Sequence, residues 1–329
     1  MARRYSGLSM KTIHWIVAGI GDIARRRVIP AILAEQRSTL YGFVTRDSSK
    51  AEAYPGRRTW PTMEQALEDP LIDAIYIALP VAMHAEAAIA ALRAGKHVLC
   101  EKPMALNDAE AQRMVAEARA PGRLLGVAYY RRLYPKLIRA KKLIAEGAIG
   151  QPVLVEANSH SWLPEEARGW LCDPALAGGG PLYDIGSHRI DAMHFLFGKP
   201  ELVSGILSNA VHRIEVEDSA TFVMQWSNGL HGVIDVRWNS HTPRDQFRVI
   251  GTEGELNLDP LNGPDLRIHS RSGTEVEMLP AHTNVHYPLV LNFVGAALAN
   301  SASALACTGE EGQWTDWVIE QTVRTAKFR

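Results

Sequence analysis

The segment that decides the fold reads IHWIVA at residues 13–18 and GIGDIA at residues 19–24. Its first half is an apolar run typical of a buried strand, and its second half matches the pattern G-x-G-x-x-A at a junction of strand and helix. In that pattern Gly19 makes a tight turn and Gly21 lets the backbone approach a pyrophosphate, while the small Ala24 lets the helix pack on the strand. The N-terminus of the helix then faces the phosphates. The residues predicted to hold a dinucleotide here are Gly19, Gly21, Asp22, Ile23 and Ala24.

This short pattern is most often an ordinary turn, so the residues around it decide what it means. Apolar runs alternate with helical patterns as far as residue 129. Strands are expected at residues 12–18, 40–45, 74–79, 97–100 and 124–129. Helices are expected between them, one ending near residue 36 and others at residues 63–67, 82–94 and 108–118. Because parallel strands separated by helices need right-handed crossovers, residues 1–129 are predicted to form an α/β domain, a doubly wound parallel sheet of the Rossmann type.

The pattern changes beyond residue 129. Helices are expected at residues 135–146, 182–197, 289–299 and 311–327. Strands are expected at residues 153–162, 202–209, 219–226, 231–238, 246–250, 255–258, 266–269 and 275–278. Glycine and asparagine turns separate most of these strands, which is typical of antiparallel hairpins. Residues 130–329 are therefore predicted to form an α+β domain with a large, mostly antiparallel sheet.

The composition is that of an ordinary globular protein. Hydrophobic residues make up 47% of the 329 residues and charged residues 22%, which argues against bulk disorder. Lys and Arg number 35 against 36 Asp and Glu, for a formal charge of -1. This balance supports neither a nucleic-acid partner nor a polybasic membrane surface. No apolar stretch reaches the roughly 18–20 residues that a spanning helix needs, so no membrane association is expected.

The N-terminus and the cysteines point to a cytoplasmic protein. Arg3 and Arg4 precede an apolar run at residues 13–20, an order that loosely resembles a signal peptide. Lys11 and His14 interrupt that resemblance, and a buried first strand is the better interpretation. The cysteines are scattered and form no C-x-x-C motif, which predicts neither a disulfide framework nor a zinc ribbon and fits a reducing compartment. They are Cys100, Cys172 and Cys307.

The end of the second predicted strand bears on the choice of cofactor. Enzymes that use NAD usually place Asp or Glu there, to bind the ribose 2′-hydroxyl. Here Thr45 is followed by Arg46 and Asp47. The guanidinium of Arg46 suits a 2′-phosphate, and Thr45 adds a hydroxyl donor, so NADP is the predicted cofactor. With NADP, Asp47 is expected to cap the next helix and so to direct its carboxylate away from the cofactor. In the alternative, which keeps NAD possible, Arg46 is solvated and Asp47 either caps that helix or binds the ribose.

Two further segments carry groups that suit proton and charge transfer. The sequence Glu101-Lys102-Pro103 ends a strand at the carboxyl edge of the predicted sheet, where ligands of such folds bind, and the proline fixes the turn so that Lys102 is aimed. Read alone, it is an ordinary surface turn.

The second segment is a glycine triplet at residues 178–180, followed by a predicted helix. The glycines are expected to let the backbone approach a ligand. Asp184, His188 and Asp191 are spaced i, i+4 and i+7, so they share one face of that helix. A histidine flanked by carboxylates, with a pKa near 6.5, suits proton transfer at neutral pH. A structural histidine or a metal site is the alternative, but no cysteine or second well-placed histidine joins the three, so no metal is predicted.

Taken in order, these motifs resemble the Gfo/Idh/MocA family of oxidoreductases. The resemblance rests on GIGDIA at residues 19–24, PVAMH at 80–84, CEKP at 100–103 and AGGGPLYDIGSHRID at 177–191. It extends over nearly the whole chain, to GTEGEL at 251–256 and TGEEGQW at 308–314. Gly169-Trp170 and residues 144–150 look most like an NADPH-using branch of the family. Where relatives often carry Trp-Arg, this chain has Trp170-Leu171.

The resemblance implies how the motifs work together. A nicotinamide ring would lie near the residues that follow the third and fourth predicted strands. These are Leu79, Pro80, His84, Glu101 and Lys102. His188 would act as acid and base on a substrate hydroxyl, Asp184 would orient the substrate, and Lys102 would bind the reacting oxygen. The substrate is expected to be a sugar or polyol. Apart from the resemblance, Tyr129 and Trp170 are predicted to contact this substrate, and the alternative is that each belongs to the core or the rim.

Two classes of function remain open on this scaffold. One is an NAD(P)-dependent oxidoreductase acting on CH–OH groups, and the other is a non-catalytic regulator that binds a dinucleotide. Because Lys102, Asp184 and His188 are all present, the enzyme is favoured. The resemblance also implies a homodimer or homotetramer formed through the sheet of the second domain.

Overall fold

The computed structural model describes residues 11–119 and 122–326, so the predictions for Arg3, Arg4 and residue 327 lie outside the described residues. A six-stranded parallel sheet has the strand order β3-β2-β1-β4-β5-β6. Its strands are β1 (Ile13–Ala18), β2 (Ser38–Val44), β3 (Arg58–Trp60), β4 (Ala74–Ile77), β5 (His97–Cys100) and β6 (Leu125–Val127). The order reverses at β1 and β4, and the predicted Rossmann fold is confirmed.

Helices cover both faces of this sheet, which is why its central strands are almost continuously apolar and buried. A π-helical turn, η1 (Ala24–Val28), leads from β1 into α1 (Ile29–Ala34). The other helices are α2 (Met63–Leu67), α3 (His84–Arg93) and α4 (Asp108–Ala118). One strand was not predicted: β3 has only three residues, none of them fully buried, so it leaves no apolar run in the sequence.

The second sheet has eight strands in the order β14-β13-β12-β11-β7-β10-β9-β8. They are β7 (Pro152–Trp162), β8 (Leu202–Ser208), β9 (Ser219–Gln225), β10 (His231–Arg237), β11 (Asn239–Gly251), β12 (Gly254–Asn257), β13 (Asp265–Ser270) and β14 (Gly273–Met278). Among the residues that the structure describes, β7 and β10 are the one pair of this sheet that runs parallel, so the mostly antiparallel sheet is confirmed. The strand expected at residues 246–250 is part of the longer β11.

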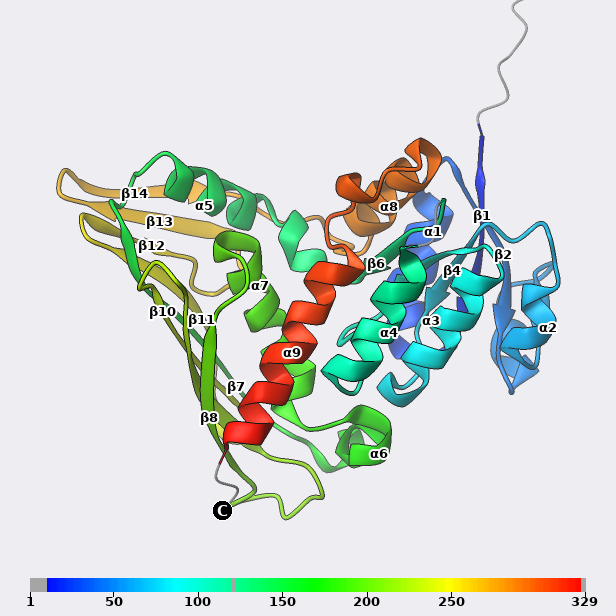
Figure 1. The fold of residues 1–329 in the computed structure, drawn as a ribbon, viewed down its shortest axis with the longest axis horizontal. Helices are drawn as coiled ribbons and strands as arrows, with labels where there is room; N and C mark the ends of the chain where they lie inside the picture. Colours follow the sequence, from blue (N-terminus) through cyan, green and yellow to red (C-terminus); the bar gives the residue numbers. More distant parts are fainter. Residues whose placement is uncertain (1–10, 120–121, 327–329) are drawn as a thin grey trace, which may run out of the picture.

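Three helices lie on one face of the large sheet (Figure 1). They are α5 (Pro135–Ala145), α7 (Ser187–Phe197) and α9 (Gly309–Thr325). The helix predicted at residues 182–197 begins as a π-helical turn, η7 (Leu182–Gly186), and continues as α7. A short helix, α6 (Pro174–Ala177), precedes the glycine triplet.

The last two helices tie the two sheets together. The apolar face of α8 (Tyr287–Ala299) packs on the parallel sheet. There the centroids of the Phe293 and Trp15 rings lie 5.2 Å apart. Helix α9 runs between the two sheets and contacts α4 on one side and α7 and β8 on the other (Figure 1). Both helices belong to the predicted second domain but contact the first half of the chain. The predicted domain boundary between residues 129 and 130 therefore stays a prediction.

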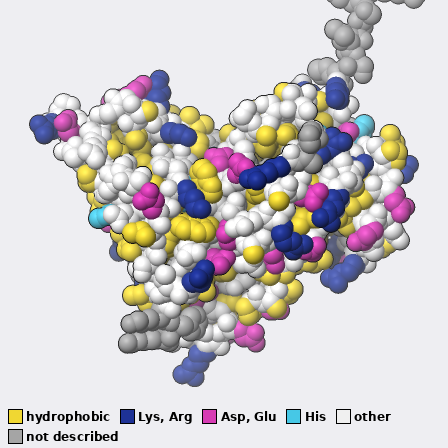
Figure 2. Space-filling model, in the orientation of Figure 1, with side chains coloured by type: hydrophobic (Ala, Val, Ile, Leu, Met, Phe, Trp, Pro, Cys, Tyr) yellow, Lys and Arg dark blue, Asp and Glu magenta, His cyan; other side chains and the backbone are white. Residues whose placement is uncertain are grey.

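The surface in Figure 2 mixes basic and acidic side chains over the face that carries α3 and α4. Several of them are paired, as in Arg93 with Glu117 at 2.9 Å and Arg113 with Glu86 at 2.7 Å. Exposed pairs of this kind add little stability. Within the described residues, no helix is both long and apolar enough to cross a bilayer.

Candidate active site

The turn after β1 has the geometry that a dinucleotide needs. Gly19 has a φ of +91°, and a Cβ at this position would lie 2.5 Å from the carbonyl oxygen of Ala78. At Gly21, by contrast, a Cβ would meet nothing within 4 Å, so the backbone there faces open space. Ala24 is wholly buried under the following helix. Since an open backbone and a helix N-terminus together suit phosphate oxygens, these residues fit a pyrophosphate.

At the end of β2, Asp47 caps the next helix, as one of the alternatives from the sequence predicted. The carboxylate of Asp47 accepts hydrogen bonds from the Ser49 amide at 3.1 Å and its hydroxyl at 2.6 Å, and so caps the short helix at Ser48–Ala51. These bonds lower the pKa of Asp47. The hydroxyl of Thr45 donates to the carbonyl of Asp47 at 3.1 Å, so it is used within the loop. Arg46 is exposed.

His84 joins the two loops at the carboxyl edge of the sheet. Its Nδ1 lies 3.0 Å from the carbonyl oxygen of Pro103, and its Nε2 lies 2.9 Å from that of Leu79. The ring is buried, and burial lowers the pKa of His84. Because both ring nitrogens face backbone carbonyls, His84 holds the loops of Pro80 and Lys102 together, and its predicted contact with a cofactor stays a prediction.

Glu101 also points into the protein. Its carboxylate accepts a hydrogen bond from the Tyr76 hydroxyl at 2.7 Å and lies 3.4 Å from Nε2 of His286. Its other oxygen accepts from the backbone amide of Lys102 at 3.2 Å. Burial opposes the charge, but the hydrogen bonds from His286 and Tyr76 keep the pKa of Glu101 below its usual value. Glu101 thus fixes the backbone from which Lys102 projects.

The side chain of Lys102 reaches across to the second domain. Its Nζ donates to the backbone carbonyl of Asp184 at 2.8 Å and to the carboxylate of Asp184 at 2.9 Å. Beside this pair lies a hollow whose lining also includes Trp170, which is 47% exposed. The lining residues are Val81, Lys102, Pro103, Trp170, Leu171, Ala177, Gly179, Tyr183 and Asp184. The structure therefore brings together three of the residues predicted to act on a substrate.

His188 lies one helical turn beyond Asp184 and is only 6% exposed. The ring of His188 packs edge to face with two tyrosine rings. The distance between ring centroids is 5.9 Å to Tyr129 and 5.1 Å to Tyr130. Among residues 11–119 and 122–326, its Nδ1 has no hydrogen-bond partner. Burial, together with the cations of Arg131 and Lys102, lowers the pKa of His188 well below 6.5. Neutral imidazole is a proton acceptor, so His188 is suited to take a proton.

Two expectations for the surroundings of His188 need correction. The carboxylates do not flank His188: that of Asp184 is held by Lys102, and that of Asp191 is held by Arg132. Tyr129 has no exposed surface, so its ring backs His188 and does not line a pocket.

The glycine triplet packs closely against the protein itself, and Gly179 also lines the hollow beside Lys102. A Cβ at Gly178 or Gly179 would meet the ring of Tyr183 at 2.5 or 2.4 Å. A Cβ at Gly180 would lie 2.0 Å from the carbonyl oxygen of Glu217. The buried carboxylate of Glu217 in turn accepts from the amides of Gly180 at 2.9 Å and Leu182 at 3.0 Å. Glu217 thereby anchors the start of η7.

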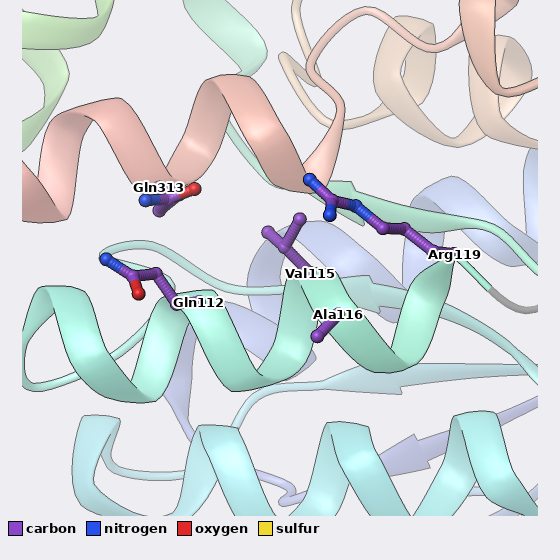
Figure 3. A pocket seen from close by; sticks show the side chains of 5 residues that line it. All are labelled: Gln112, Val115, Ala116, Arg119 and Gln313. Atoms are coloured by element: carbon purple, nitrogen blue, oxygen red, sulfur yellow. The ribbon is translucent and has the colours of Figure 1, made fainter.

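Glu217 and His286 are the residues of the site that the sequence did not indicate. Each acts on a segment far away in the chain, and neither lies in a motif, so only the fold shows their partners. Within the described ranges, no three His, Cys, Asp or Glu side chains are grouped to hold a metal ion. A second hollow lies between α4 and α9, and none of the predicted site residues lines it (Figure 3).

The chain is similar to known proteins over most of its length. A model of an oxidoreductase family with an NAD-binding Rossmann fold matches residues 13–129, and a model of the GFO/IDH/MocA C-terminal domain matches residues 137–257. The chain is 30% identical to the 1,5-anhydro-D-fructose reductase of Ensifer adhaerens, over 92% of each protein.

Two solved structures have the same overall fold. One is the aldose-aldose oxidoreductase of Caulobacter crescentus in complex with glycerol, with a TM-score of 0.87 and 26% identity over 96% of this chain and 97% of that one. The other is a variant of a 3-ketoreductase from Actinomadura kijaniata in complex with TDP-benzene and NADP. Its TM-score is 0.84, with 25% identity over 97% of this chain and 99% of that one.

Proposed function

Since the chain belongs to the Gfo/Idh/MocA family of oxidoreductases, we propose that it transfers hydride between a nicotinamide cofactor and a CH–OH group of a sugar, polyol or related compound. The observation that carries the proposal is the contact of Lys102 with Asp184, at 2.8 and 2.9 Å, one turn from His188. This contact joins the carboxyl edge of the dinucleotide-binding sheet to the second domain. Ligands of such folds bind at that edge.

Each side chain has a role that follows from its surroundings. The Lys102 ammonium donates hydrogen bonds, so it stabilises the negative charge that develops on the substrate oxygen. Neutral His188 takes the proton of the hydroxyl in oxidation and returns it in reduction. Asp184 orients the substrate through its exposed oxygen. When bound, the nicotinamide ring accepts or supplies the hydride.

The proposed cofactor is NADP. Arg46 is exposed at the end of β2, and Asp47 directs its carboxylate to Ser49, which supports a role for the Arg46 cation in binding a 2′-phosphate. The 3-ketoreductase at 25% identity was solved with NADP, which supports the same choice. NAD remains the alternative that a direct comparison of binding would reveal.

The proposed substrate class follows from the relatives. One is a reductase of 1,5-anhydro-D-fructose, and another acts on aldoses and holds glycerol. Trp170 offers an exposed aromatic face beside Lys102 and Asp184, which suits the ring of a sugar. Leu171 in the same hollow makes one wall apolar.

A screen of sugars, polyols and their carbonyl counterparts tests the proposal, with NADP(H) and NAD(H) in parallel and turnover followed at the nicotinamide absorbance band. Turnover of at least one substrate, faster with NADPH or NADP⁺, is the expected result. If the protein binds a dinucleotide but turns over none of these compounds, the non-catalytic regulator replaces the enzyme.

We also propose a homodimer or homotetramer in a reducing, cytoplasmic setting. Leu202 and Ile206 on the edge strand β8 and Val223 on β9 share the face of the large sheet away from the helices, and each is at least 50% exposed. Apolar side chains grouped in this way favour a symmetric contact. Cys100, Cys172 and Cys307 form no disulfide, which supports the reducing setting. Sedimentation that finds only a monomer would remove the assembly from the proposal.

A further inference from the structure

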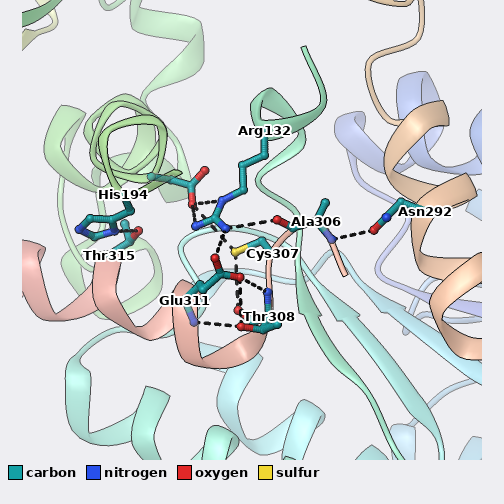
Figure 4. A network of polar contacts seen from close by, with 9 residues as sticks. Arg132, His194, Asn292, Ala306, Cys307, Thr308, Glu311 and Thr315 are labelled. Carbon is teal, nitrogen blue, oxygen red and sulfur yellow. Dashed lines mark hydrogen bonds and ion pairs between the residues drawn. The ribbon is translucent and has the colours of Figure 1, made fainter. Parts of the chain in front are cut away.

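A buried cluster of charges lies behind His188 and takes no part in the proposed chemistry. Arg132, in the 3-10 turn η4 (Tyr130–Leu133), is 2% exposed. Its Nε and Nη2 lie 2.9 and 2.8 Å from Oδ1 of Asp191, and its Nη1 lies 2.6 Å from Oε1 of Glu311 and 3.2 Å from the carbonyl oxygen of Ala306. Figure 4 shows the guanidinium between these segments. We call Arg132, Asp191 and Glu311 the charge triad.

The charge triad grips the helix that carries His188. Asp191 follows His188 by three residues on α7, so the two side chains share one face of the helix on successive turns. Turn η4 contacts both turns at once, because the ring of Tyr130 lies against His188 at 5.1 Å and Arg132 binds Asp191. Helix α7 therefore cannot rotate or slide without breaking one of the two contacts.

The other end of the charge triad reaches the sheet that carries Lys102. Glu311 lies in the first turn of α9, where it forms a capping box with Thr308. Thr308 forms a bridge with Gly126, and the amide of Val127 donates to the carbonyl of Cys307 at 3.1 Å, so this segment is attached to β6. Strand β6 pairs with β5, which ends just before Glu101 and Lys102. The triad is thus a short connection between the two halves of the site.

From this arrangement we propose that the charge triad is a positioning device that sets the distance between Lys102 and His188. The inference rests on the proposed function, because it concerns the two groups that act on the same oxygen. A displacement of about 1 Å between reacting groups costs about a hundredfold in rate. Burial raises the pKa of Asp191 to about 6, so the carboxylate depends on Arg132, and loss of Arg132 would leave the Asp191 charge buried and unpaired.

The test compares Glu311→Gln and Asp191→Asn with a matched control, Glu277→Gln. Glu277 forms a bidentate pair with Arg139 at 2.8–3.0 Å, joins α5 to β14, and has a side chain about as buried as that of Glu311. We expect Asp191→Asn to lower kcat about ten- to hundredfold and Glu311→Gln to lower it less. The KM and the Kd of the cofactor should stay within about twofold, because the hydrogen bonds of Arg132 are with Asp191, Glu311 and Ala306 and not with the turn at Gly19. Glu277→Gln should leave kcat unchanged.

A second readout does not depend on turnover. The imidazole resonances of His188, assigned by their loss in His188→Ala, should shift in Glu311→Gln and not in Glu277→Gln. If Glu311→Gln keeps the parent kcat and the parent His188 resonances while its melting temperature falls as in the control, the triad only stabilises the fold and the proposal is wrong. Should Asp191→Asn fail to fold, Glu311→Gln decides alone. Should the parent show no turnover, the proposed function fails, and the resonances still decide whether the triad positions His188.

Discussion

Two glycine-rich turns, one in each half of the chain, look alike in sequence and differ in what fills them. Each leads into a π-helical turn and then an α-helix: Gly19–Gly21 into η1 and α1, and Gly178–Gly180 into η7 and α7. At Gly21 the space that a side chain would take is open. At Gly180 the same space holds the carbonyl oxygen of Glu217.

The difference separates a ligand cradle from a packing device. An open glycine leaves its backbone free for the phosphates of a dinucleotide, whereas a filled one lets the chain draw close to itself and fix a helix. In the second turn the chemistry comes from side chains after the glycines, Asp184 and His188. Binding and chemistry should therefore respond separately to substitutions in the two turns.

The largest effect is expected from the side chains that follow the second turn. His188→Ala and Lys102→Met should each lower turnover by about 10²–10⁴-fold, the usual contribution of acid–base and oxyanion groups. The cofactor Kd, measured by fluorescence titration, should change little in His188→Ala, because the ring of His188 packs on Tyr129 and Tyr130 and not on the turn at Gly19. Losses below tenfold in both variants would place the chemistry elsewhere.

The two glycines themselves give the most direct contrast. Gly180→Ala should destabilise the protein by about 1–3 kcal/mol or more, since its Cβ would lie 2.0 Å from a backbone oxygen. Gly21→Ala meets no protein atom within 4 Å, so it should fold like the parent and bind the cofactor more weakly. Thermal unfolding and cofactor titration of both variants measure this. Equal unfolding temperatures would mean that the second turn is as open as the first.

Substitution of Arg46 tests which cofactor the first turn binds. Arg46→Ala should reduce the preference for NADPH over NADH by about 1.5–3 kcal/mol, the scale of a hydrogen bond to a charged group. Dissociation constants for both cofactors, at one salt concentration, give the result in parent and variant. A parent that prefers NADH, or a ratio that the substitution leaves unchanged, contradicts the assignment of NADP.

The smallest effect concerns pH. Because the pKa of His188 is lowered well below 6.5, kcat/KM for oxidation should stay level from pH 8 down through 6.5 and fall only below the folded pKa. Reduction needs the protonated ring of His188, so kcat/KM for reduction should fall as the pH rises from 6.5 to 8. The group also makes stability decrease as pH drops below 6.5, because the unfolded chain then binds a proton that the folded one resists. An oxidation profile with its midpoint near 6.5 would show that neither burial nor the nearby cations lower the pKa of His188.

Much of the fold was predictable because its signals are local. The alternation of apolar runs and helices predicts the parallel sheet, and the hairpin turns predict the antiparallel one. Strand β3 escaped prediction because three residues at a sheet edge need no apolar pattern. The helix cap formed by Asp47 could be predicted, because it depends on Ser49, only two positions away.

The site was predictable in its residues and not in their surroundings. The motifs indicate Lys102, Asp184 and His188, but helical spacing alone predicted that carboxylates flank His188. In the structure each carboxylate is bound by a cation from another segment, and those partners depend on tertiary contacts. The surroundings of His84 could not be predicted for the same reason. The motif gives its position in the sequence, and only the fold shows that a backbone carbonyl oxygen lies next to each ring nitrogen.

The packing of α8 on the parallel sheet has a consequence for how the protein is made. Strands β1 to β6 are translated before the large sheet, yet Phe293 and its apolar neighbours on α8, which cover the parallel sheet beside Trp15, are translated only after it. Until then, the part of the nascent sheet that α8 covers lies open to water and to chaperones. The nucleotide-binding half therefore reaches its final form only after the large sheet and α8 have been translated.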